Sequence, residues 1–204
     1  MPTSHPPLPP TFEALYRQLS QLPEPLRGEI LDGSLIVSPR PGVPHARAGA
    51  EIEAEIYSRF GRKPGGSGFP GGWWILPEPE LHFLFPDQTH VLAPDLAGWK
   101  RERLPSLPRS SFLTLPPDWV CEILSPSTAR YDRKGKARVY HRAGVTWRWL
   151  VDPNIREIEA FRREGDFWVQ LGVWGDEEKV RIAPFDAIEL DLADWWEGVD
   201  REEE

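Results

Sequence analysis

Residues 120–128 read Val120-Cys121-Glu122-Ile123-Leu124-Ser125-Pro126-Ser127-Thr128. The first five residues form an apolar, strand-like run that is interrupted by one carboxylate, Glu122. A second run of the same kind, Ala93-Pro94-Asp95-Leu96-Ala97-Gly98-Trp99, carries Asp95. An ionised side chain inside an apolar strand is costly unless it is paired or binds a metal. Two such acids together suggest a metal site on a β-sheet.

The composition indicates one globular domain. A chain of 204 residues that is 40% hydrophobic can bury one good-sized core. We expect a flexible proline-rich arm at 1–10, a single domain at 11–197 and an acidic tail at 198–204. Cys121 is the single cysteine, which excludes disulfides within the chain and a cysteine zinc site. The absence of a signal peptide and of a long apolar run predicts a cytoplasmic protein without a membrane partner.

The net charge of −8 is concentrated near the end of the chain. Residues 186–204 hold nine acids and one base, whereas residues 1–185 carry 23 bases and 23 acids. Positive charge gathers at 130–142, where six Lys or Arg residues meet one acid. This segment could contact a phosphate backbone, and the alternative is an ordinary solvated helix face. The candidate nucleic-acid contacts are Arg130, Arg133, Lys134 and Arg138.

The order of elements predicts an α/β (α+β) fold with one curved mixed sheet flanked by helices. Helices are expected at 12–19, 44–60, about 128–141 and near 192–196. Asp32-Gly33 predicts a hairpin between strands at 29–31 and 35–37, and the glycine-rich run at 61–72 predicts a mobile loop. Ten tryptophans should cover the sheet, unless an exposed subset serves a dimer interface or base stacking. The other expected strands are 73–76, 80–85, 91–99, 119–124, 146–151, 157–163, 167–173 and 180–182.

Asp95 and Glu122 can share one ion if the strands that carry them are neighbours, because adjacent strands lie about 5 Å apart. Carboxylates and water are the ligands that a hard divalent cation prefers. Mg²⁺ is therefore the expected ion, with Mn²⁺ as an option. Such an ion binds a phosphate oxygen and lowers the pKa of a bound water, which is the chemistry of phosphodiester hydrolysis.

A lysine often completes such a site by offsetting transition-state charge. Position 124, two residues after the glutamate, is Leu, so the lysine must come from elsewhere. Lys136, on the helix that follows, is the best candidate. The alternative is a surface ion pair, since Asp132 and Lys136 have the i,i+4 spacing that contributes about 0.2–0.5 kcal/mol. Ser125 to Thr128 similarly indicate a helix cap first and a phosphate contact second.

The chain resembles the Uma family of restriction endonuclease-like proteins, which is placed in the PD-(D/E)XK nuclease superfamily. The resemblance covers about residues 12–196 and depends on the ordered succession of its motifs. They are Gly28-Glu29-Ile30-Leu31-Asp32-Gly33, Ser38-Pro39, His45 at a helix start, Pro94-Asp95, Glu122-Ile123-Leu124-Ser125-Pro126-Ser127-Thr128, Asp132 with Lys136 and Tyr140, Gly144-Val145 and Val151-Asp152-Pro153.

This resemblance implies a restriction-endonuclease-like core with metal ligands at Asp95, Glu122 and Ile123. Glu29 would be an additional acid that orients a metal-bound water. Lys136 would replace the lysine that the superfamily usually carries on the strand. The implied catalytic residues are therefore Glu29, Asp95, Glu122 and Lys136.

The chain departs from the superfamily's pattern in two places. The acid-x-lysine motif of the superfamily reads Glu122-Ile123-Leu124 here. Residue 34 is Ser where many relatives have an acid. His45 is expected to form hydrogen bonds at a helix start and is not expected to bind the metal.

Three functions remain open on sequence grounds. The leading hypothesis is a Mg²⁺-dependent endonuclease that hydrolyses nucleic acid, with DNA as the expected substrate and a homodimer as one option. The alternative is a nuclease-fold binding or regulatory module without turnover, which the absence of net positive charge in residues 1–185 favours. A purely structural dimer formed through tryptophans leaves the paired acids unexplained.

Overall fold

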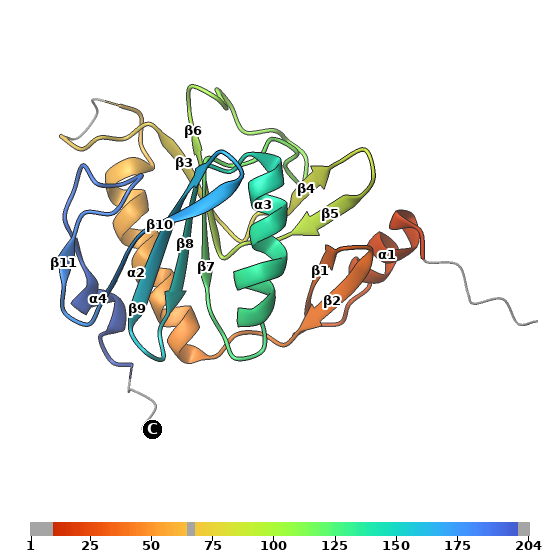
Figure 1. The fold of residues 1–204 in the computed structure, drawn as a ribbon, viewed down its shortest axis with the longest axis horizontal. Coiled ribbons are helices and arrows are strands. Elements are labelled where there is room, and N and C mark those ends of the chain that lie inside the picture. The colour runs from red at the N-terminus through yellow and green to blue at the C-terminus, as the bar shows by residue number, and fades with distance from the viewer. Residues whose placement is uncertain (1–9, 65–67, 200–204) are drawn as a thin grey trace, which may run out of the picture.

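The structure is a computed structural model that describes residues 10–64 and 68–199 (Figure 1). Most of the expected arm, part of the expected acidic tail and residues 65–67 of the expected glycine loop lie outside the described residues.

A six-stranded mixed sheet forms the centre of the fold. Its order is β10-β9-β8-β7-β6-β3, and β7 and β8 are parallel while the other neighbours are antiparallel. The parallel pair is joined by the helix that carries Lys136, the usual crossover connection for parallel strands. The strands are β3 (Trp73–Pro77), β6 (Leu96–Lys100), β7 (Trp119–Ile123), β8 (Trp147–Asp152), β9 (Glu157–Glu164) and β10 (Phe167–Gly175).

The predicted mixed sheet with flanking helices is confirmed, but the expectation of one sheet is corrected. The predicted strand at 91–99 divides between two sheets at Ala93-Pro94-Asp95, because Pro94 has no N–H to donate to a ladder. A separate antiparallel sheet of order β2-β1-β5-β4 results. Its strands are β1 (Arg27–Leu31), β2 (Ser34–Ser38), β4 (Leu81–Leu84) and β5 (Thr89–Leu92), and a small sheet pairs β11 (Lys179–Val180) with β12 (Leu190–Asp191).

The helices begin and end where the sequence indicates. Thr11 caps the first helix by accepting a hydrogen bond from the Ala14 N–H, 3.3 Å away. The predicted helix at 128–141 contains a π-helical segment, η1, followed by an α-helix that ends at Gly144, whose φ of 88° suits glycine. The bounds are α1 (Phe12–Leu19), α2 (Val43–Phe60), η1 (Tyr131–Lys136), α3 (Ala137–Ala143) and α4 (Leu192–Trp196).

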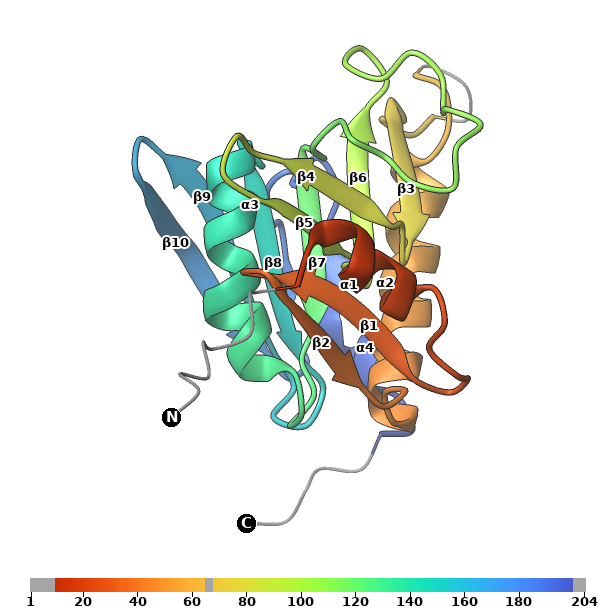
Figure 2. The ribbon, with the colours of Figure 1, turned by 90° about the vertical axis from the view of Figure 1, so that its right-hand side faces the viewer.

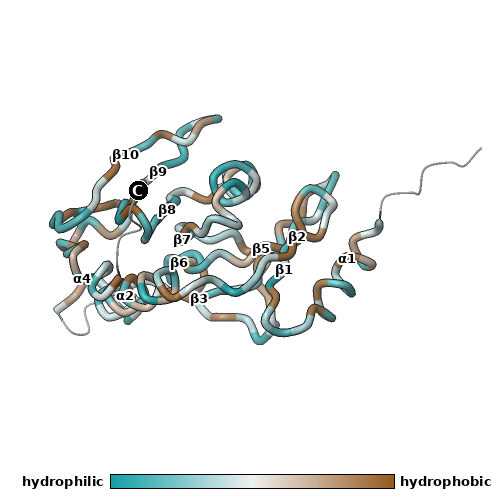
Figure 3. The backbone as a smooth tube through the Cα atoms, turned by 90° about the horizontal axis from the view of Figure 1, so that it is seen from below, coloured by the Kyte–Doolittle hydropathy of each residue, from teal (hydrophilic) through white to brown (hydrophobic). Residues whose placement is uncertain are grey.

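Helices cover both faces of the central sheet (Figures 1 and 2). On one face, Ile52 and Ile56 of α2 pack with Cys121 and Ile123 of β7. On the other face, α3 packs against β6 and β7 together with β4 and β5 of the second sheet. Successive strand residues point to opposite faces, so Glu122 lies on the α3 side. Figure 3 places α1 and α4 at opposite ends of the molecule.

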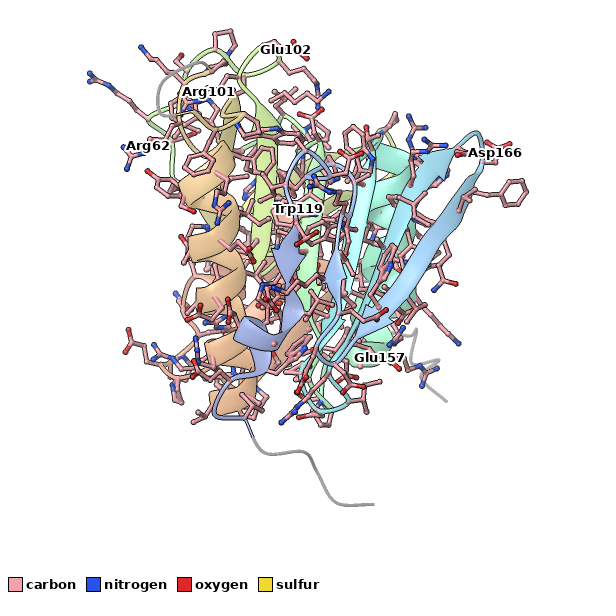
Figure 4. The ribbon with its side chains drawn as sticks, turned by 90° about the vertical axis from the view of Figure 1, so that its left-hand side faces the viewer. Arg62, Arg101, Glu102, Trp119, Glu157 and Asp166 are labelled. Atoms are coloured by element: carbon pink, nitrogen blue, oxygen red, sulfur yellow. The ribbon has the colours of Figure 1, made fainter. Side chains whose placement is uncertain are left out.

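The tryptophans serve mainly the core, as expected. Six of them are buried, and Trp119, between α2 and the sheet in Figure 4, contacts Trp149 edge-on at 5.2 Å. Aromatic side chains of this size dominate core burial. The buried tryptophans are Trp73, Trp99, Trp119, Trp149, Trp195 and Trp196. No helix in the described part of the chain combines the length and apolar character that crossing a bilayer requires.

Candidate active site

Segments distant in the sequence meet at one cavity of about 230 Å³. Glu29 comes from β1, Asp95 from the residues just before β6 and Glu122 from β7. Asp132 and Lys136 reach the same cavity from η1. The register explains part of this convergence, because Leu96 pairs with Cys121 and so places Asp95 beside the end of β7.

Lys136 connects the acids of the cavity. Its Nζ lies 3.0 Å from Glu122 Oε2, 3.1 Å from Glu29 Oε2 and 2.9 Å from Asp132 Oδ1. The residue is only 5% exposed, and Asp132 only 2%. The alternative of an ordinary surface ion pair between Asp132 and Lys136 is therefore wrong.

Three of the acids also accept a hydrogen bond that fixes their orientation. The Tyr140 hydroxyl donates to Glu122 Oε1 at 2.6 Å, and the Ala93 N–H donates to Glu29 Oε1 at 2.7 Å. Asp95 Oδ2 accepts from the Ile123 N–H at 2.7 Å. These contacts hold the carboxylates in one arrangement and satisfy polar groups that burial would otherwise leave unpaired.

Ile123, an implied metal ligand, lies beside Asp95 but offers little to an ion. Its side chain is buried on the α2 side, close to Gly49. Its N–H is committed to Asp95, so its carbonyl oxygen is the one group that could bind a metal.

The π-helical segment determines which side chains face inward. Asp132, Gly135 and Lys136 are buried, whereas the basic residues between and beside them are exposed. Gly135 allows a close approach to β1, because a Cβ there would lie 2.6 Å from Leu31 Cδ2 and the Leu31 side chain would have to shift. π-Helical turns occur frequently at functional sites.

Five carboxyl groups, the Lys136 ammonium and the Arg27 guanidinium line the cavity, so negative charge is in excess. Burial raises the pKa of Glu122 well above its ordinary value, against the opposing effect of Lys136. Burial also raises the pKa of Glu29. Burial alone would lower the pKa of Lys136, but Glu122, Glu29 and Asp132 raise it well above its ordinary value. Lys136 therefore stays charged, and the acids favour uptake of a proton or a cation.

The donor set suits a hard divalent cation. Asp95 and Glu122 supply oxygen atoms, and each oxygen retains acceptor capacity beyond its present contact. Within residues 10–64 and 68–199, no group of three or more His, Cys, Asp or Glu side chains forms a ready metal cluster. Mg²⁺ often binds only one or two carboxylates and keeps several waters. The carboxylates of Asp95 and Glu122 are therefore enough protein ligands for this ion.

The predicted basic contacts lie on the outer side of the same helix. Arg130, Arg133, Lys134 and Arg138 are exposed and line a groove separate from the cavity. Arg133 pairs with Glu159, and Arg138 NH2 lies 2.6 Å from Asp32 Oδ2. Their position on a shared surface is compatible with the predicted role, which stays a prediction.

Sequence reasoning assigned no function at the site to Tyr140, and it gave His45 only a hydrogen-bonding role at a helix start. Tyr140 follows Lys136 by one helical turn, the spacing that places both on one helix face, and this was the available signal. His45 Nε2 lies 3.1 Å from Asp95 Oδ1 across the cavity. No sequence pattern could have paired His45 with Asp95, because the two lie on different elements.

A mixed sheet with helices on both faces, and with acids at the ends of adjacent strands, defines the restriction-endonuclease-like fold. The chain belongs to the Uma2 family, described as "Putative restriction endonuclease", whose model matches residues 10–193. A crystal structure of "a putative nuclease belonging to DUF820" from Anabaena variabilis is similar, with a TM-score of 0.69 and 21% identity. The match covers 89% of this chain and 96% of that one. No curated protein matches the chain.

Proposed function

We propose that this protein is a divalent-metal-dependent endonuclease that hydrolyses phosphodiester bonds of nucleic acid, with DNA as the first candidate. The observation that carries this proposal is the Lys136 ammonium within 3.1 Å of three carboxylates, in a cavity that Asp95 also lines. Membership of a family described as endonucleases and the nuclease fold support the same class.

Asp95 and Glu122 would hold the ion, with the Ile123 carbonyl as a further oxygen ligand. Mg²⁺ or Mn²⁺ bound there would act as a Lewis acid on the phosphate and lower the pKa of an attacking water. Tyr140 keeps its proton, since burial and the charge of Glu122 raise its pKa well above the ordinary value. Tyr140 therefore acts as a hydrogen-bond donor that orients Glu122.

Glu29 and Lys136 would serve the chemical step. The raised pKa of the Glu29 carboxyl makes its Oε2 a better proton acceptor for the attacking water. The Lys136 ammonium, which is held charged, would offset negative charge that develops on the phosphate. A homodimer remains one option, because it would bring together the two sites that cutting both strands of a duplex needs.

One observation favours a second candidate, a nuclease-fold binding module without turnover. Lys136 already pairs with Glu29, Glu122 and Asp132, so the site is partly neutralised without an added ion. In this alternative the lysine would take the place of the metal, and the fold would serve recognition alone.

Cleavage assays separate the two candidates. Single-stranded and double-stranded DNA are incubated with wild type, Glu122→Gln and Lys136→Met in Mg²⁺, in Mn²⁺ and in EDTA. The endonuclease predicts cutting by wild type with metal and at least a hundredfold loss in both variants. Equal cutting by wild type and Glu122→Gln would reveal a contaminating nuclease, and binding without cutting would establish the silent module.

A further inference from the structure

A second, larger hollow lies on the solvent side of the helix that carries Lys136. Its volume is about 1070 Å³. Helix η1 and α3 form its floor, and the β1–β2 and β9–β10 hairpins stand on either side of that helix (Figure 1). Asp166 marks the tip of the β9–β10 wall in Figure 4. We call this hollow the helix groove.

The floor of the helix groove is basic. Arg130 and Lys134 make no ion pair within the described part of the chain, and both are exposed. Arg133 and Arg138 add two further cations, each with one acidic partner. The groove therefore presents unneutralised positive charge along one helix face, which suits a phosphate backbone.

Aromatic side chains accompany these cations. Tyr131 on the floor is 41% exposed, and Phe167 on the β10 wall is 72% exposed. Trp168 lies next to them, fixed by a 2.9 Å hydrogen bond from its Nε1–H to the Ala137 carbonyl oxygen. Large aromatic surfaces usually bury themselves. Their exposure beside unpaired cations indicates a ligand with flat, apolar faces and negative charge.

The helix groove adjoins the catalytic cavity. Helix η1 presents Arg130, Tyr131 and Lys134 to the groove and Asp132 and Lys136 to the cavity. Strand β2 does the same, since Ser34 and Ile36 line the groove and Ser38 lines the cavity. A chain bound in the groove can therefore continue to the acids without leaving the protein surface.

From these observations the geometry points to single-stranded nucleic acid as the occupant of the helix groove, with Tyr131 and Phe167 stacking on unpaired bases while Arg130 and Lys134 bind phosphates. This inference depends on the proposed function, because it makes the groove the substrate-binding part of the same site. Bases in a duplex are stacked on each other and cannot stack on these rings, whereas a single strand presents its bases. A duplex would also have to be bound mainly by charge, and residues 1–185 have no net charge.

Fluorescence anisotropy in EDTA tests the inference without turnover. Labelled single strands of DNA and RNA of about 12 nucleotides are compared with the corresponding DNA duplex. Wild type should bind a single strand at least tenfold more tightly than the duplex. Tyr131→Ala should weaken single-strand binding about tenfold, and Tyr131→Phe should restore it, because the ring face supplies the contact. Arg130→Ala and Lys134→Ala should each reduce the slope of log affinity against log salt.

Matched controls exclude general effects. Tyr57→Ala removes a tyrosine that is 44% exposed on α2, and Arg62→Ala removes an exposed arginine beyond that helix (Figure 4). Both should bind like wild type, and circular dichroism should show all variants folded. Equal or tighter duplex binding, or unchanged single-strand binding by Tyr131→Ala, would overturn the inference.

The inference and the proposed function can fail separately. Single-strand binding that depends on Tyr131, together with no cleavage in Mg²⁺ or Mn²⁺, would end the hydrolase proposal and leave the groove assignment in place. Metal-dependent cleavage with the same KM for wild type and Tyr131→Ala would support the hydrolase proposal and overturn the groove assignment. If the protein binds single-stranded RNA more tightly than single-stranded DNA, the groove assignment holds and the expected substrate is RNA.

Discussion

At the scale of single residues, one buried ammonium group holds the site together. Lys136 neutralises part of the charge of Glu29, Glu122 and Asp132, all within 3.1 Å of its Nζ. A buried ion group of this kind contributes little compared with apolar packing, but it is costly to break, because removal of one partner leaves the others buried and unpaired.

Replacement of Lys136 by Met should therefore destabilise the protein strongly. Methionine matches the volume of the lysine stem but leaves three carboxyl groups without their cation, so we expect a loss of about 3–5 kcal/mol in the free energy of unfolding. Urea unfolding of wild type and Lys136→Met at pH 7 measures it. The exposed Lys134→Met is the matched control and should change stability by less than about 0.5 kcal/mol.

Glu122→Gln should change how stability depends on pH. Burial raises the pKa of Glu122, so the folded protein binds this proton more readily than the unfolded chain does. The benefit of that proton is complete below the ordinary pKa and is lost as pH rises through the raised one. The free energy of unfolding of wild type should therefore fall as pH rises through the raised pKa, and the variant should lack this fall.

Unfolding in EDTA between pH 5 and pH 9 provides the measurement for Glu122→Gln. As pH rises, the difference in unfolding free energy between the two proteins should shift in favour of the variant. A difference that stays constant over this range would contradict the raised pKa of Glu122.

At the scale of elements, the π-helical segment and its contact with β1 position the residues of the candidate site. Gly135 lets η1 approach the hairpin closely, and Lys136 follows directly after it. The elements therefore set the distance between the Lys136 ammonium and the Glu29 carboxylate of β1.

Gly135→Ala should push η1 away from the hairpin. The added Cβ would lie 2.6 Å from Leu31 Cδ2 in a buried contact, and overpacking of this kind costs about 1–3 kcal/mol. The Tm in a thermal unfolding experiment and the rate of metal-dependent cleavage should both decrease. The double variant Gly135→Ala with Leu31→Ala frees the space and should recover part of the activity, whereas additive losses in the double variant would argue against the steric cause.

At the scale of the whole molecule, metal binding should couple to stability. Glu29 and Asp95 approach the cavity from the second sheet and the connection between the sheets, and Glu122 and Lys136 approach it from the central sheet and its helix. The folded chain is thus needed to bring the ligands together, and a ligand that binds only the folded state stabilises it.

Mg²⁺ or Mn²⁺ should raise the Tm of wild type in a concentration-dependent way. At a hundred times the dissociation constant the gain is about 2.7 kcal/mol. Differential scanning calorimetry with and without EDTA measures the shift, and Asp95→Ala should abolish it. KCl at equal ionic strength controls for screening. A shift that persists in Asp95→Ala would place the ion elsewhere.

The sequence alone determined the local structure and the kinds of side chain that are available to the candidate site. The spacing of Ile52 and Ile56 predicted α2, Asp32-Gly33 predicted the hairpin, and carboxylates in apolar runs marked Asp95 and Glu122 as unusual. These features are local consequences of residue type and periodicity, so they can be predicted from the sequence alone. The boundaries of a single domain at 11–197 remain a prediction.

Only the tertiary structure decided which of these groups meet. The division of the strand at Pro94, the π-helical turn and the approach of His45 to Asp95 all depend on contacts between distant segments. The Asp132–Lys136 spacing is the same for a surface pair and for a buried one, and only the folded structure shows that this pair is buried. Burial strengthens the interaction between Asp132 and Lys136, because the energy between two charges depends on the surrounding dielectric. The spacing of the two residues in the sequence does not specify that dielectric.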